Sequence, residues 1–189
     1  MEDLGCDFFM AGCHKWLFGP RGTGIVWGTK QAWARLRPTI PSFMDGESWT
    51  AWALDREPRG PTDAERVTPG GFKAFDHQWA LAEAFSFHQD IGKRRIAERT
   101  RELSRQLKEG LAAMGHVTLH TPLAEELSAG IVCFEVRGRS APAVVQRLEA
   151  KDIVATTTPY VESYPRLCPC IYNTPEEVDV ALGAIRAMD

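Results

Sequence analysis

A turn rich in glycine and proline separates two short apolar segments near the start of the chain. The first segment is CDFFMAG, Cys6–Gly12, and the second is GIVWGT, Gly24–Thr29. Continuous apolar runs of this length, bounded by glycine, are typical of buried strands. Buried strands belong to larger, mostly parallel sheets, and we expect nothing in this chain to cover or pair these two. The sequence therefore predicts the end of a larger sheet.

Lys15 lies between these segments, directly after His14. A lysine beside apolar residues at a strand end can act as a nucleophile or form a Schiff base. An ordinary surface lysine at a strand end is the alternative. The following GPRGTG run favours the chemical role, because Pro20 fixes a backbone angle and the glycines permit positive φ. The loop is therefore predicted to hold Lys15 on one path.

The glycine run Gly19–Gly24 is close to two nucleotide-binding motifs and fits neither. It has the span of a Walker A loop, but Ile25 and Val26 stand where lysine and serine or threonine are needed. The dinucleotide-binding fingerprint places its glycines ahead of a helix, whereas here they precede a predicted strand. Nucleotide binding is therefore disfavoured.

Composition excludes several further classes. The 189 residues, 44% of them hydrophobic, suffice for one real core or two small ones. The net charge is -3 with acids and bases intermixed, which gives no nucleic-acid footprint. We find no run of about 18 apolar residues that would span a membrane. The opening MEDLGCDFF lacks the basic region of a signal peptide, so we expect a cytoplasmic protein.

Cysteine spacing indicates neither a disulfide framework nor a metal site. The five cysteines are an odd number, and Cys168 and Cys170 form a C-x-C without two further ligands at suitable spacing. We therefore expect reduced thiols and no bound metal.

The rest of the chain predicts a long helical region followed by a small α+β layer. Residues 37–71 hold five of the twelve prolines and predict a long irregular stretch. A helical pattern runs from Asp76 to Met114, with a break at Gly92 and Gly115 as its C-cap. In the first half of this pattern a period of four joins Trp79, Glu83, Phe87 and Ile91. The remaining predicted elements are strands at 116–120, 129–136 and 153–157, a helix opening at Ser140, and a final helix opening at the capping box Thr174-Pro175-Glu176-Glu177.

Three segments together resemble the class V aminotransferase family, the fold-type-I enzymes that use pyridoxal 5'-phosphate (PLP). AGCHKWLFGPRGTGIVWG (11–28) is similar to the segment that carries the cofactor lysine. VTPGGFKAFDHQWALAEAF (67–85) resembles the loop and helix that follow it, and YPRLCPCIYNTPEEVDVAL (164–182) resembles the C-terminal signature. Relatives include cysteine desulfurases and isopenicillin N epimerase-like proteins. The resemblance covers essentially the whole chain, and only the C-terminal part of a family member.

The resemblance implies a truncated α/β fold of the PLP-dependent transferase type. Residues 1–75 would be the remnant of the large PLP-binding domain with its lysine loop. Residues 76–115 would be a long connecting helix region, and residues 116–189 the small C-terminal α+β domain.

The resemblance also implies roles for individual residues. Lys15 would form the Schiff base with PLP and shuttle the α-proton as general base and acid. His14 would lie beside the cofactor phosphate, the alternative being a histidine satisfied by backbone at a strand end. Arg166 would bind the substrate α-carboxylate, the alternative being an exposed strand arginine. Gly70 and Gly71 would reach the phosphate of the other subunit through backbone N–H groups, since this chain lacks the hydroxyl found in many relatives.

Two departures from the family pattern limit these implications. The stretch Val154–Ser163 lacks the nucleophilic cysteine of cysteine desulfurases, so desulfurase activity is disfavoured, and Cys168 is expected only to pack beside Arg166. In the family an aspartate on the pyridinium nitrogen, a stacking ring and hydroxyl groups around the phosphate all precede the lysine. Only 14 residues precede Lys15, so we expect that half of the site to lie outside this chain.

The implied function is the C-terminal part of an enzyme acting on an amino acid by α-proton transfer. Transamination, epimerisation and β-elimination use the same lysine, cofactor and arginine and stay open. The alternative is an inactive fragment, or a half-protein that needs a separate N-terminal chain. A generic α+β binding domain would leave the three matching segments unexplained. The expected partners are an amino-acid substrate and, in the full-length protein, a second copy of the chain, with no nucleic acid or membrane.

Overall fold

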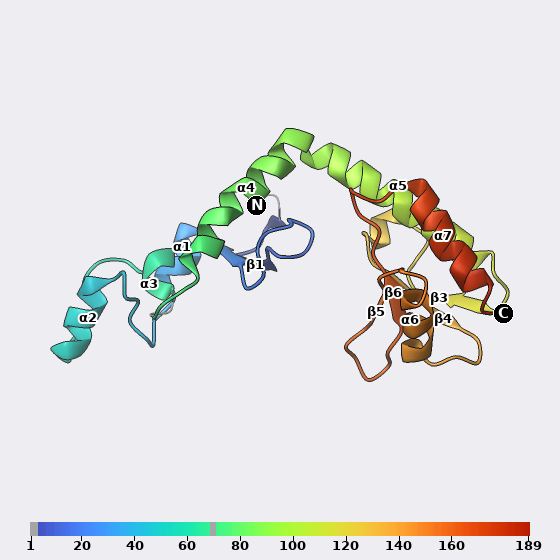
Figure 1. Cartoon of the computed structure of the whole chain (residues 1–189). Coiled ribbons are helices and arrows are strands. Elements are labelled where there is room, and N and C mark those ends of the chain that lie inside the picture. The colour runs from blue at the N-terminus through green and yellow to red at the C-terminus, as the bar shows by residue number, and fades with distance from the viewer. Residues whose placement is uncertain (1–3, 69–70) are drawn as a thin grey trace. The chain divides into compact units, whose positions relative to one another are not determined.

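The computed structural model describes residues 4–68 and 71–189, which fall into two compact units, Met1–Phe87 and His88–Asp189. The first unit contains β1 (Phe8–Gly12), β2 (Gly24–Gly28), α1 (Lys30–Ala34), α2 (Gly46–Ala53), α3 (Ala64–Val67) and most of α4 (Phe75–Ile91) (Figure 1). The second contains α5 (Lys93–Ala112), β3 (Val117–Leu119), the 3-10 turn η2 (Glu125–Leu127), β4 (Val132–Val136), α6 (Ala141–Glu149), β5 (Thr156–Thr157), β6 (Pro165–Leu167) and α7 (Pro175–Arg186).

The two predicted N-terminal strands are present, but they pair with each other. β1 and β2 form an antiparallel pair whose register runs from Phe8↔Gly28 to Gly12↔Gly24. The expectation that nothing in the chain pairs them is therefore wrong, because the intervening loop folds back and brings the two strands together. They remain partly uncovered within the described part of the chain, with Met10 74% exposed and Val26 54% exposed.

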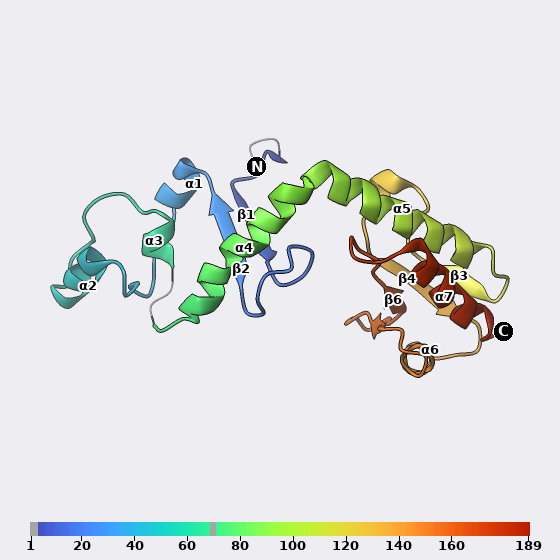
Figure 2. The same cartoon turned by 45° about the horizontal axis from the view of Figure 1, so that its top comes forward.

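Helix α4 runs alongside the β1–β2 pair (Figures 1 and 2). The predicted break at Gly92 is confirmed, since α4 ends at Ile91 and Gly92 has a φ of 91° directly before α5. The period of four identified this helix correctly but not its buried side. Trp79 is 74% exposed, whereas Ala84 is buried and Leu81 half-buried.

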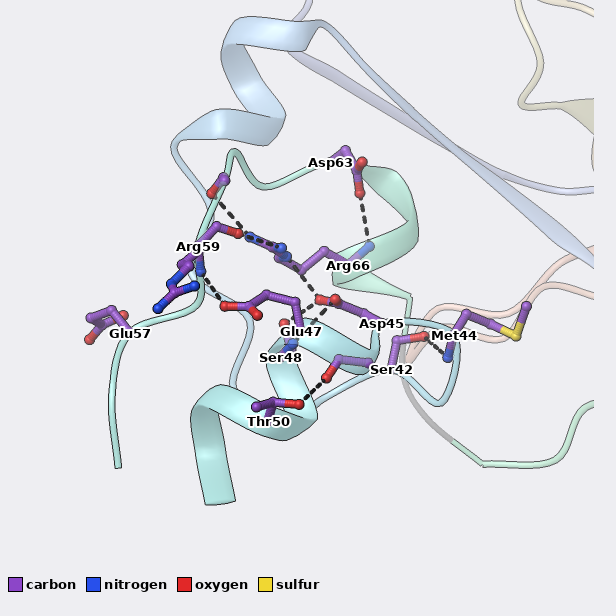
Figure 3. A network of polar contacts seen from close by, with 12 residues as sticks. Ser42, Met44, Asp45, Glu47, Ser48, Thr50, Glu57, Arg59, Asp63 and Arg66 are labelled. Atoms are coloured by element: carbon purple, nitrogen blue, oxygen red, sulfur yellow. Dashed lines mark hydrogen bonds and ion pairs between the residues drawn. The ribbon is translucent and has the colours of Figure 1, made fainter. Parts of the chain in front are cut away.

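The stretch predicted as irregular contains the short helices α2 and α3, which a polar network joins (Figure 3). Asp45 caps α2 by accepting from the Ser48 N–H at 3.2 Å, and it also accepts from Arg66 Nε at 2.9 Å. The side chains of this ion pair are each only 12% exposed. The remaining guanidinium nitrogens of Arg66 donate to the carbonyls of Arg59 and Gly60. One arginine thus ties α3 to α2 and to the loop between them.

Glu47 makes the second centre of this network (Figure 3). Its carboxylate accepts from Arg56 Nη1 at 2.6 Å and from the Arg59 N–H at 2.8 Å. The hydrogen bond from Arg56, followed by that from Arg59, lowers the pKa of Glu47 from 4.5 to about 2. For Asp45, burial opposes the change, but the hydrogen bonds from Ser48 and Arg66 outweigh it and lower the pKa. Both carboxylates are therefore held in their charged form.

This depressed pKa predicts acid sensitivity of the first unit. Because the folded pKa of Glu47 lies below its ordinary value of 4.5, its contribution is complete above pH 4.5 and is lost as pH falls toward 2. We expect Glu47→Gln to weaken the pH dependence of stability in that window. Urea unfolding followed by tryptophan fluorescence measures it, because all six tryptophans lie in this unit.

Glu83→Gln provides the control, since Glu83 is exposed on α4 and has no ion pair among the described residues. It should leave the loss of stability between pH 4.5 and pH 2 unchanged. If Glu47→Gln and the unaltered chain lost the same stability over this pH range, the proposed contribution of Glu47 would be contradicted.

The second unit is a sheet covered by helices, as the sequence predicts, and its strands pair antiparallel. The strand order is β3-β4-β6-β5, and α5 and α7 lie side by side (Figure 2). One core cluster joins the inward side chains of β4 and β6 to all three helices, so the helices share one face of the sheet. Its members include Leu103, Leu107, Leu111, Val132, Phe134, Val136, Val144, Leu148, Leu167, Leu182 and Ile185.

Helix ends follow the sequence in one case and depart from it in another. The capping box before α7 is confirmed, with Thr174 accepting from the Glu177 N–H and Glu177 accepting from the Thr174 N–H. Gly115 is not the C-cap of α5, which ends at Ala112 with Ala113 as its cap. The cap keeps right-handed helical angles and donates to the carbonyls of Glu109 and Leu111, so no glycine is required there. Among the described helices, none combines the length and hydropathy that crossing a membrane requires.

A buried lysine fastens the loop between β3 and β4 to α5. Lys108 is 2% exposed, and its Nζ donates to the carbonyls of Pro122 and Leu123 and to Ser128 Oγ, all within 3.0 Å. Three neutral oxygens therefore satisfy all three donors of the ammonium group.

We expect Lys108→Ala to lower the free energy of unfolding of the second unit by about 1–3 kcal/mol, because three acceptors lose their donor. Lys151→Ala, at an exposed position, should change it by less than about 0.5 kcal/mol. Urea unfolding followed by far-ultraviolet circular dichroism gives the difference, with tryptophan fluorescence as an internal reference for the first unit. Equal losses in the two variants would show that the Lys108 contacts contribute nothing.

Candidate functional site

The predicted lysine lies on the loop that joins β1 to β2, and we call residues 13–23 the lysine loop. The Cys13 N–H donates to the Thr23 carbonyl at 3.0 Å and the Gly19 N–H donates to the Cys13 carbonyl at 2.8 Å. These two bonds close the base of the loop. Inside it, the Phe18 N–H donates to the Lys15 carbonyl at 3.0 Å. The main chain on both sides of Lys15 is therefore fixed by backbone hydrogen bonds.

The second half of the lysine loop is a tight turn. Thr23 donates to the Pro20 carbonyl through its N–H at 3.4 Å and through Oγ1 at 2.6 Å. Gly22 has a φ of 81°, which suits glycine, and Phe18 has a φ of 58°, which is uncommon for a bulky residue. The fixed path predicted from the proline and the glycines is therefore present.

Lys15 and His14 both have exposed side chains on this loop. The Lys15 amine is thus accessible to a reagent or cofactor. The His14 imidazole lies close to Gly12, where an added Cβ would be 3.2 Å from His14 Cε1. The structure places the two predicted residues on one loop, and their predicted roles stay predictions.

Of the two glycines expected at a phosphate, only Gly71 belongs to the part of the chain that the structure describes. Gly70 lies outside the described residues. Gly71 has a φ of 102°, and an added Cβ would meet no heavy atom within 4 Å. Its backbone therefore needs glycine for its conformation and not for space.

Arg166 lies on β6 in the second unit, on the sheet face opposite the helices. Its neighbours in the strand, Pro165 and Leu167, are buried, whereas Arg166 is half-buried and paired with Cys133 of β4 and Thr156 of β5. Its Nε donates to Thr156 Oγ1 at 2.7 Å. In the described part of the chain no carboxylate forms an ion pair with it. The terminal nitrogens are therefore oriented by Thr156 and available for a bidentate anion.

The surroundings of Arg166 include groups that the sequence analysis did not single out. His120 stacks on Tyr164 at a ring distance of 3.9 Å, and its Nε2 lies 3.2 Å from Glu135 Oε2. The hydrogen bond to Glu162 raises the pKa of Tyr164. The signal that could have found Glu135 is the alternation along β4, which places it on the same face as Cys133.

Thiols also lie near this arginine. Burial raises the pKa of the Cys133 thiol, although the charge of Arg166 opposes the change. Cys168 follows Arg166 by two residues and is exposed, and all five cysteines are free.

The comparison with known families now identifies the class. The Aminotransferase class-V family model matches residues 1–180. The chain belongs to this family, and the fold and family expected from the sequence are confirmed.

Individual relatives agree with this assignment. The chain is 28% identical to a cysteine desulfurase of Klebsiella pneumoniae, covering 98% of this chain and 46% of the relative. It is 29% identical to isopenicillin N epimerase of Streptomyces clavuligerus, covering 100% of this chain and 48% of the relative. The chain therefore spans about half the length of these curated relatives.

Solved structures show the same fold. The apo cysteine desulfurase of Thermococcus onnurineus NA1 superposes with a TM-score of 0.85 at 23% identity, covering 99% of this chain and 48% of that one. A variant of a cystine C–S lyase, with glycine covalently linked to its PLP cofactor, superposes with a TM-score of 0.79 at 23% identity, covering 98% of this chain and 47% of that one. At 23% identity, these superpositions show the fold of the chain.

The lysine loop predicts a strict requirement for glycine at position 19. An added Cβ would lie 2.7 Å from Leu81 Cδ2 and 2.9 Å from the Cys13 carbonyl oxygen. Because that carbonyl accepts the Gly19 N–H, it cannot move away without opening the loop. We expect Gly19→Ala to lower the free energy of unfolding of the first unit by about 1–3 kcal/mol, measured by tryptophan fluorescence in urea.

Gly46→Ala is the matched control. An alanine Cβ there would meet no heavy atom within 4 Å, at the first residue of α2. It should be neutral or slightly stabilising. If Gly19→Ala proved as neutral as Gly46→Ala, the close packing of the lysine loop would be refuted.

Proposed function

We propose that the chain is the C-terminal part of a PLP-dependent enzyme that acts on an amino acid by Schiff-base formation and α-proton transfer. The observation that carries the proposal is the exposed Lys15 amine on a hydrogen-bonded loop, in a chain that the class V family model matches over residues 1–180. Family membership supports PLP as the cofactor.

The chemistry of the available groups fits this cofactor. An accessible primary amine is the group that condenses with an aldehyde, and Lys15 offers one. We place His14 beside the cofactor phosphate, and Gly70 and Gly71 at the phosphate of a second subunit in a homodimer. When bound, PLP supplies the electron sink that stabilises a carbanion at the substrate α-carbon.

Two residues of this chain then act on the substrate. Lys15 Nζ takes the α-proton as a general base and returns a proton as a general acid. Arg166 binds the α-carboxylate through its two terminal nitrogens, because Thr156 already occupies Nε. The proposal goes no further than α-proton transfer, because transamination, epimerisation and β-elimination all use these same groups.

A second candidate is that this chain works only together with a separate N-terminal chain, or is inactive by itself. This second candidate is supported by the coverage of about half of each curated relative. In that case Lys15 would still react with the cofactor, whereas turnover would require the partner.

The test is reduction of the chain with borohydride in the presence of PLP, followed by peptide mapping. We expect the reduced pyridoxyl group mainly on Lys15, because its loop is fixed and its amine exposed. The competing lysines are Lys30, Lys73, Lys93 and Lys151, whereas Lys108 is buried.

Lys15→Arg is the control variant, since it keeps the charge and cannot condense with the aldehyde. It should lose the main labelled peptide and keep only the background on other lysines. Labelling spread evenly over the exposed lysines of the unaltered chain would contradict the proposed cofactor role of Lys15.

A further inference from the structure

One side of α4 packs against the lysine loop at three levels. His77 Nδ1 lies 3.1 Å from the Arg21 carbonyl oxygen. One turn further along, Leu81 fills the space above Gly19. Near the end of α4, the Phe87 ring meets the Phe18 ring edge-on at 6.3 Å between centroids.

These helix residues share one side of α4. Positions 77, 81, 84 and 87 are spaced by four, three and three residues, the spacing of neighbours on a helix surface, and Ala84 is buried. His77, Leu81 and Phe87 thus contact three successive parts of one loop. The contacts reach both halves of the lysine loop, the turn at Lys15–Phe18 and the turn at Pro20–Thr23.

The polar contact is the most specific of the three. A carbonyl oxygen only accepts, so Nδ1 of His77 must carry the hydrogen and donate to Arg21. The Arg21 carbonyl lies within the turn closed by Thr23 on Pro20. A donor from α4 therefore holds the middle of a turn whose ends are already hydrogen-bonded.

We infer that His77 is a positioning residue for Lys15, acting through the Arg21 carbonyl and supported by Leu81 at Gly19. This inference rests on the proposed function for its consequence at the cofactor, but the positioning itself is a property of the lysine loop. Asn is the conservative replacement, because its side-chain N–H₂ can donate from nearly the same place as Nδ1. Leu has a similar size and no donor.

The experiment compares His77→Leu and His77→Asn with the unaltered chain. The first measurement is amide hydrogen exchange in peptides covering residues 16–24, which needs no cofactor. We expect exchange of the Gly19 and Thr23 amides to rise about fivefold in His77→Leu, the ratio that corresponds to one hydrogen bond of ordinary strength, and to be largely restored in His77→Asn. Gln78→Leu, an exposed neighbour on α4, controls for the added leucine.

The second measurement is the amount of pyridoxyl group trapped on Lys15 at limiting PLP, expected to fall several-fold in His77→Leu and to recover in His77→Asn. Unchanged exchange in His77→Leu would overturn the inference whatever the labelling result. Raised exchange with equal labelling on Lys15 would show that His77 orders the loop without positioning Lys15, and would also overturn it. Absence of Lys15 labelling in the unaltered chain would instead count against the proposed function, and the exchange result would still decide whether His77 holds the loop.

Discussion

The pairing of β1 with β2 is the constraint on which the candidate cofactor site depends. The last residues of that pair, Gly12 and Gly24, lead directly into the hydrogen bond between the Cys13 N–H and the Thr23 carbonyl. Because this bond closes the base of the lysine loop, the main chain at Lys15 has a defined position relative to the two strands. The exposed amine is thus free to react, while its main chain is held.

The second unit also presents a side chain, the guanidinium group of Arg166, from a backbone position that the sheet fixes. Its core is built on the helix-covered face of the sheet, so alternate residues of β4 and β6 point away from that core. Arg166 stands on that outer face, where Thr156 on the neighbouring strand fixes Nε. In the second unit the sheet register places Arg166 on the outer face, and one hydrogen bond to Thr156 orients its guanidinium group. In the first unit several backbone hydrogen bonds hold the loop that carries Lys15.

Sequence patterns predicted the elements better than their packing. The apolar runs, the break at Gly92 and the capping box at Thr174 all report local backbone physics, and each was found where predicted. The pairing of β1 with β2 depends on how the long loop folds back, which no local pattern encodes. The contact from His77 to Arg21 joins residues 56 positions apart, so only the folded chain reveals it. The resemblance to the family singled out Lys15 and Arg166, while Thr156 emerged only from the strand register.

The proposed role of Lys15 is to move a proton at the α-carbon of a bound amino acid. The most direct measurement is the exchange of the α-hydrogen of an amino acid for deuterium in D₂O, followed by NMR with PLP and the chain present. Free PLP gives a background rate, so the comparison is with Lys15→Ala at the same PLP concentration. We expect faster exchange with the unaltered chain than with Lys15→Ala. Equal rates for the two proteins would contradict it.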